Sequence, residues 1–92
     1  MPNVLRIGSY YVYFWTDEGT EPIHVHISTG KPTPNATKLW LTKAGHCVVS
    51  HNNSQIPEHK LNKIIEVIED QFFYICLKWQ ETFGNDSLNF YC

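Results

Sequence analysis

The stretch EPIHVHIS, residues 21–28, alternates apolar and polar side chains with a period of two after its proline. Alternate side chains of a β-strand point to the same face, so this period predicts a strand. The two isoleucines and the valine then share one face, which can be buried in a core, and His24 and His26 share the other. The stretch therefore predicts a sheet with one apolar face, and its two histidines are the first candidates for chemistry.

Extended segments flank this stretch on both sides. Upstream, residues 4–7 and 10–15 are rich in β-branched and aromatic side chains and are separated by Gly-Ser, a pattern typical of a hairpin. Downstream, residues 38–42 alternate with period two, and residues 46–51 form another short strand-like run. Because the connections are short, neighbouring strands are expected to be antiparallel.

The spacing of apolar residues along the sequence changes after residue 54. Apolar residues then recur at steps of three and four, as they do on one face of an amphipathic helix. They are Leu61, Ile64, Ile65, Ile68, Phe72, Ile75, Trp79 and Phe83. Pro57 and Gly84 are typical of the beginning and the end of a helix. We predict one long helix over residues 57–83, roughly 40 Å in length, which must bend or project past strands of about 20 Å.

The second half of this helix carries another apolar set, Phe73, Tyr74 and Leu77. Two explanations are open: the sheet and the tail cover these side chains, or they form an interface with a partner. The charged residues of the helix are expected to form a solvated face. They are Lys60, Lys63, Glu66, Glu69 and Asp70.

Together these patterns predict the α+β class: an antiparallel sheet of four to five strands followed by one long C-terminal helix packed on one face. The 92 residues are expected to form a single α+β domain over residues 1–84, with residues 85–92 as a C-terminal tail that packs back or frays. The helix is expected to cover Ile23, Val25 and Ile27, so that His24 and His26 lie on the far face of the sheet or at its edge.

Composition excludes several classes of protein. Hydrophobic residues make up 42% and charged residues 17%, which favours a folded globule over disorder. The net charge of −2 gives no broad basic field for generic duplex binding. Neither a secretory signal nor a bilayer-spanning segment is visible, so we expect a cytoplasmic protein without a membrane partner. The chain has three cysteines, Cys47, Cys76 and Cys92. They form no CxxC pair and are expected to be free thiols.

The histidine pair supports a metal-binding interpretation. Imidazoles two residues apart on one strand point the same way, so His24 and His26 can reach a single divalent ion. A third ligand is then needed. The candidates are Asp17, Glu18, His46 and His51. If the pair does not bind metal, no cofactor is expected.

A second interpretation is acid–base catalysis, in which His24 and His26 divide the acid and base roles in cleaving RNA. Lys31 and Lys38 would bind a phosphate, with Arg6 as a further cation. Aromatic side chains would stack on a base. The candidates are Tyr13, Trp15 and Trp40. In a third interpretation, the histidines line the solvent side of the sheet and bind Asp17, Glu18 or water.

Four motifs carry a resemblance. They are the opening MPNVLRI, the run DEGTEPIHVHI after an aromatic strand, the strand KLWL and the helix end KWQETFG. They resemble the small bacterial family catalogued as domain of unknown function 4160, in which a Pro-Pro-His-x-His strand follows an acidic turn. The resemblance covers about residues 1–84, and Ile23 stands in place of the second proline.

The resemblance implies a cytoplasmic bacterial protein, often encoded beside another small protein in a toxin–antitoxin-like pair. It implies no catalytic residues. We therefore hypothesise a component of a two-gene module that acts on RNA through the His-x-His strand. The alternatives are a non-enzymatic protein-binding module, such as an antitoxin or regulator, and a metal-binding domain. The expected partner is a small protein encoded nearby, with RNA second, and self-association is left open.

Overall fold

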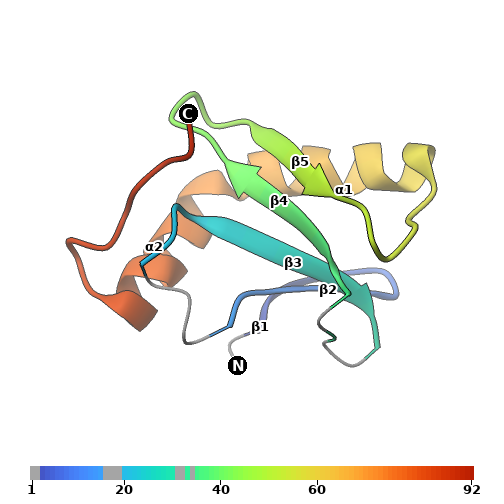
Figure 1. The fold of residues 1–92 in the computed structure, drawn as a ribbon, viewed down its shortest axis with the longest axis horizontal. Coiled ribbons are helices and arrows are strands. Elements are labelled where there is room, and N and C mark those ends of the chain that lie inside the picture. Colours follow the sequence, from blue (N-terminus) through green and yellow to red (C-terminus); the bar gives the residue numbers. More distant parts are fainter. Residues whose placement is uncertain (1–2, 16–19, 31–32, 34) are drawn as a thin grey trace.

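The computed structural model describes residues 3–15, 20–30, 33 and 35–92. Its elements are β1 (Asn3–Ile7), β2 (Tyr10–Tyr13), β3 (His24–Thr29), β4 (Thr37–Leu41), β5 (Cys47–His51), α1 (Glu58–Asp70) and α2 (Phe72–Phe83). The strands form one antiparallel sheet in the order β1-β2-β3-β4-β5; in Figure 1, α1 lies behind the sheet and α2 runs from behind it to its left side. The α+β class and the antiparallel sheet are thus confirmed. In the described part of the chain, no helix has the length and apolar character needed to cross a membrane.

The register of the strands decides which side chains share a face. β1 and β2 form a hairpin that pairs Ile7 with Tyr10, and Gly8 at φ +59° supplies the left-handed conformation that such a two-residue turn favours. In the centre of the sheet, His26 pairs with Tyr13 on one side and with Lys38 on the other. Because directly opposite residues share a face, these three side chains form a row on one surface of the sheet.

The core lies between the sheet and the helices. The predicted face of β3, which carries Ile23, Val25 and Ile27, is buried there. Its partners include the predicted helix residues. These are Leu61, Ile64, Ile68, Phe72, Ile75 and Trp79. The orientation expected for β3 is therefore confirmed.

The prediction of one long helix is wrong, because the helix breaks at Gln71 (φ −101°, ψ 22°). Its N–H is shared between the carbonyls of Val67 and Ile68 at 3.0 and 3.2 Å, so the last turn of α1 tightens. An unbroken helix over residues 57–83 would be about 40 Å long. The longest dimension of the molecule is 35 Å. The break therefore lets both halves keep their apolar side chains on the sheet.

Residues 84–92 pack back onto the domain, which settles the alternative left open for the tail. Asn89 accepts a hydrogen bond from the Ile23 N–H at 2.8 Å. The ring of Tyr91 stacks on Trp40, with centroids 5.0 Å apart and planes within 8°. In Figure 1 the tail runs from the end of α2 back to the turn between β4 and β5. One end of the sheet is thus covered by the chain's own C-terminus.

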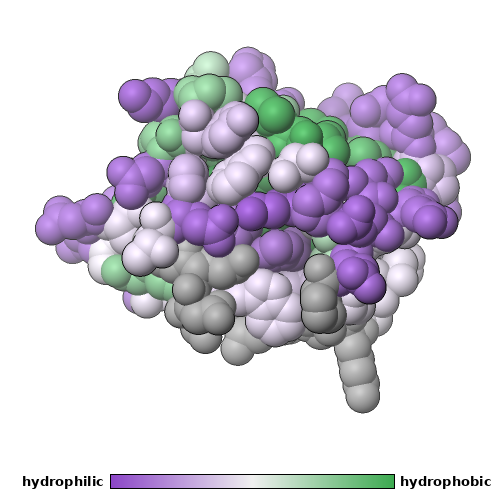
Figure 2. Space-filling view, in the orientation of Figure 1, coloured by the Kyte–Doolittle hydropathy of each residue, from purple (hydrophilic) through white to green (hydrophobic). Residues whose placement is uncertain are grey.

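The sheet face that the helices do not cover is mostly polar at its surface. Figure 2 shows polar surface across this face and hydrophobic surface gathered over β5. β5 lies at an edge of the sheet and carries two exposed valines, Val48 and Val49. Such an edge can recruit another strand.

Candidate functional site

His24 and His26 are both buried, with 0% and 9% of their surface exposed. Their rings lie edge to face, 5.1 Å between centroids. The interpretation that they line the solvent side of the sheet is therefore wrong, because aromatic rings from three elements and the segment after β2 enclose them. Its two acidic partners, Asp17 and Glu18, lie outside the described residues.

His24 is held by its backbone and by two indole rings. Its Nδ1 lies 2.9 Å from the Pro22 carbonyl oxygen. A carbonyl only accepts hydrogen bonds, so Nδ1 carries a proton and donates it. Trp40 and Trp79 each meet the imidazole edge to face at 5.4 Å. Trp79 belongs to α2, so the end of this helix reaches the start of β3 and fixes the orientation of His24.

His26 lies in an aromatic cluster of its own. It stacks on Tyr13 with centroids 5.6 Å apart and an angle of 27° between the rings, and Trp15 lies 6.5 Å away. Tyr13 is itself fully buried, and its hydroxyl accepts a hydrogen bond from the Thr33 N–H at 3.3 Å. Of the three aromatic candidates for base stacking, Tyr13 is therefore buried and Trp40 is covered on one face by Tyr91.

The cations predicted to bind phosphate are not gathered in the part of the chain that the structure describes. Lys38 Nζ lies 3.2 Å from Glu21 Oε1 and 4.2 Å from the centre of the Trp40 ring, so its charge is paired within the protein. Arg6 lies over the ring of Tyr11 at 4.9 Å. Lys31 lies outside the described residues.

The described residues do not assemble a group of three side chains suited to a metal ion. His51 pairs with Lys38, which separates it from His26 by one whole strand. Two strand spacings amount to about 10 Å, so the two histidines are not neighbours in the sheet. His46 lies elsewhere, near α1. Metal binding by His24 and His26 thus lacks a third ligand among the described residues.

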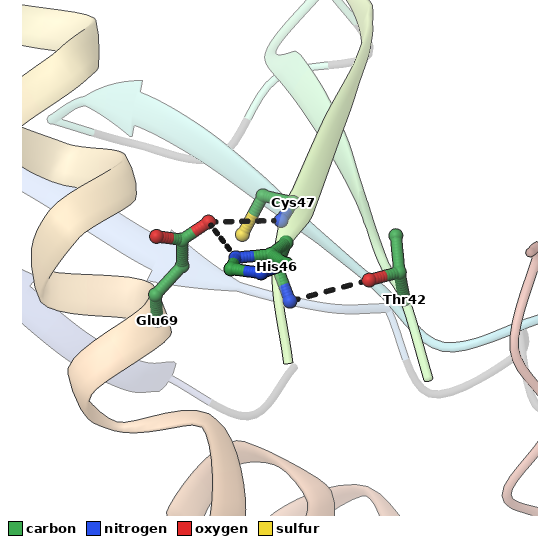
Figure 3. Close-up of polar contacts among 4 residues, drawn as sticks. All are labelled: Thr42, His46, Cys47 and Glu69. Carbon is green, nitrogen blue, oxygen red and sulfur yellow. Dashed lines mark hydrogen bonds and ion pairs between the residues drawn. The ribbon is translucent and has the colours of Figure 1, made fainter. Parts of the chain in front are cut away.

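Sequence reasoning missed a polar cluster that joins α1 to β5 (Figure 3). The carboxylate of Glu69 accepts a hydrogen bond from the Cys47 N–H at 3.2 Å and lies 3.3 Å from His46 Nδ1. Glu69 therefore does not belong to a solvated face, as its charge had suggested, but caps a backbone N–H of an edge strand. No local pattern could reveal this pairing, because the partners lie more than 20 residues apart in the sequence.

Glu69 also affects the thiol of Cys47. Burial, and secondarily the negative charge of Glu69, raise the pKa of this thiol from 9.0 to about 12. The thiol is then protonated at neutral pH. Because the thiolate is the nucleophile, Cys47 is suited to a structural role and not to covalent catalysis.

The outer face of α2, defined here as Phe73, Tyr74 and Leu77, is apolar and exposed. The three side chains expose 85%, 40% and 52% of their surface. Neither the sheet nor the tail covers them, so the first explanation offered for this set is wrong. Adjacent exposed apolar side chains of this kind mark sites of interaction.

The fold and its surfaces define a small α+β domain: an antiparallel five-stranded meander followed by two helices, with a buried histidine pair on its central strand. The chain belongs to the family described as Domain of unknown function (DUF4160), whose family model matches residues 9–80. The match begins after β1 and ends before the tail. No curated protein and no solved structure matches the chain.

Proposed function

We propose that this protein is a non-enzymatic, protein-binding component of a cytoplasmic two-gene module of the toxin–antitoxin type. The observation that carries the proposal is the exposure of the α2 outer face, above all of Phe73. Covering one large apolar side chain contributes about 2 kcal/mol to association. A partner that covers all three side chains would gain enough to offset part of the entropy lost on binding.

The surroundings of the histidines support binding over catalysis. A general acid or base must reach the proton that it transfers, directly or through one water. His24 is fully buried and donates to a backbone carbonyl, and Lys38 is paired with Glu21. RNA cleavage by His24 and His26 remains a prediction, and the burial of His24 weighs against it.

The test is co-expression with the protein encoded by the adjacent gene, followed by affinity purification. Wild type is expected to retain the partner in stoichiometric amount, and Phe73→Ser/Leu77→Ser is expected to lose it. Val48→Ala/Val49→Ala removes two exposed apolar side chains from the edge of the sheet and serves as the matched control. Loss of the partner only in the valine variant would indicate that the binding surface lies on β5 and not on α2.

A second measurement separates binding from catalysis. Induced expression of wild type and of His26→Gln, with total RNA analysed in parallel, avoids the fully buried His24, whose replacement would disturb the fold. Binding alone predicts intact RNA with both proteins. Fragmentation of RNA with wild type but not with a folded His26→Gln variant would contradict the proposal and support the His-x-His hypothesis.

A further inference from the structure

Carboxylates border the α2 outer face. Glu66 and Asp70 precede it by two helical turns and one turn, respectively, and Glu81 follows Leu77 by one turn. Between residues 66 and 81 the chain has four carboxylates (Glu66, Glu69, Asp70 and Glu81) and one lysine, Lys78, a net charge of −3. The whole chain carries −2. Negative charge is thus concentrated around the exposed apolar side chains.

Two of these carboxylates have no polar partner in the part of the chain that the structure describes. Glu69 binds β5 and Glu81 lies 3.6 Å from Lys78. Glu66 and Asp70, in contrast, form no ion pair and no side-chain hydrogen bond with another described residue. Together with Val67 and Glu69 they line a surface hollow of about 540 Å³ at the end of α1.

This placement is unfavourable for the helix alone. Like charges four residues apart repel, and carboxylates in the last turn oppose the helix dipole. α1 has no basic residue in that turn to compensate them. A cationic group from another molecule would relieve both effects.

We infer that the partner of the α2 outer face is an amphipathic helix that carries Lys or Arg beside its apolar stripe. This inference rests on the proposed function. The apolar stripe would cover Phe73, Tyr74 and Leu77, which lie at helical spacing and suit helix-on-helix contact. A basic side chain one or two turns away would enter the hollow beside Glu66 and Asp70. A second copy of this chain fits less well, because two surfaces of charge −3 repel.

Two designed helical peptides test the inference with the full chain. Both carry the same leucine stripe, but one has lysines and the other glutamates on its flanks. Fluorescence anisotropy at low salt is expected to show the lysine peptide binding at least about tenfold more tightly, and salt is expected to reduce the difference. Glu66→Lys/Asp70→Lys is expected to abolish or reverse the preference, whereas the control Glu58→Lys, at the other end of α1, leaves it unchanged.

The outcomes separate the inference from the proposed function. Equal binding of both peptides, or an unchanged preference in Glu66→Lys/Asp70→Lys, would overturn the inference and leave the apolar surface in place. Self-association of the free protein that Phe73→Ser abolishes would also overturn it, in favour of a second copy. Binding of the lysine peptide that Phe73→Ser/Leu77→Ser does not weaken would contradict the proposed function itself.

Discussion

The histidine pair of β3 and the outer face of α2 place their side chains in opposite environments. His24 and His26 are polar and titratable, yet they lie buried among aromatic rings. Phe73 and Leu77 are apolar, yet both are exposed to solvent. Exposed apolar groups and buried polar groups are both informative departures from the usual distribution.

The two regions differ in how far other side chains of the protein cover them. Side chains around the histidines have contacts inside the fold: the Pro22 carbonyl for His24 Nδ1, Glu21 for Lys38 and the Tyr91 ring for Trp40. On the α2 outer face, in contrast, Phe73 and Leu77 are exposed. The histidines are therefore enclosed by the fold, whereas the apolar side chains of α2 form the surface that we propose for recognition.

The largest expected effect comes from Trp79, the residue that links α2 to the histidine region. Trp79→Ala removes contacts with Phe14, His24 and Phe83 and leaves a cavity, so we expect a loss of about 3–5 kcal/mol in the free energy of unfolding. Urea denaturation followed by circular dichroism measures it. Its half-buried neighbour provides the control, because Lys78 makes a surface ion pair and Lys78→Ala should change stability by only about 0.5 kcal/mol.

The histidines themselves provide the next test of the comparison. His24→Ala should lower the free energy of unfolding by about 2–3 kcal/mol, since it empties a fully buried site. His26→Ala should cost less, because His26 retains some exposure. Equal stability of His24→Ala and wild type in urea titrations would show that the imidazole does not serve the core, and would restore a functional role.

Cys47 extends the comparison to a third residue type that can carry chemistry. Its raised pKa lowers the reactivity of its thiol. With a pKa of about 12 its thiolate fraction at pH 8 is about a thousandfold below that of a thiol at 9.0. Alkylation by iodoacetamide, followed by mass spectrometry, should therefore modify the exposed Cys92 and spare Cys47. The rate at Cys47 should rise about tenfold per pH unit between pH 8 and 11.

Glu69 supplies the control for that measurement. Glu69→Gln removes the charge that contributes to the raised pKa, so Cys47 should react faster at a given pH. Rapid alkylation of Cys47 in folded wild type at pH 8 would contradict the assignment of a structural thiol.

The smallest effect on stability is expected on the outer face of α2. Phe73→Ser/Leu77→Ser should change the free energy of unfolding by no more than about 1 kcal/mol, because both side chains are exposed. Thermal melting measures it. A large loss of stability would mean that these side chains serve the fold, and the contrast with the histidines would collapse.

Much of the fold could be predicted from periodicity. The alternation in residues 21–28 identified the buried face of β3, and the steps from Leu61 to Trp79 identified the helical residues in the core. The break at Gln71 could not be found in this way, because no Pro or Gly marks it. It follows from fitting the apolar stripe within a molecule 35 Å long, which is a tertiary constraint.

The candidate site was harder to predict. The sequence shows that His24 and His26 share a face, but not that Trp79 and Trp40 enclose one imidazole. The sequence shows which residues are charged. It does not show that Glu21 pairs with Lys38 or that Glu69 binds the backbone of β5. These contacts join distant segments, so local spacing carries no signal for them. The α2 outer face was visible as a second apolar set, and only the fold showed that these side chains are exposed.

Hydroxyl-radical footprinting tests the central claim most directly, because it reports the solvent access of individual side chains. The free protein should be oxidised strongly at Phe73 and Leu77 and hardly at His24. In the complex with the protein encoded by the adjacent gene, protection should appear on Phe73, Tyr74 and Leu77, while the β3 histidines stay unchanged. Protection that falls on Trp15 and His26 instead, with Phe73 still oxidised, would contradict the account and return the function to the histidine strand.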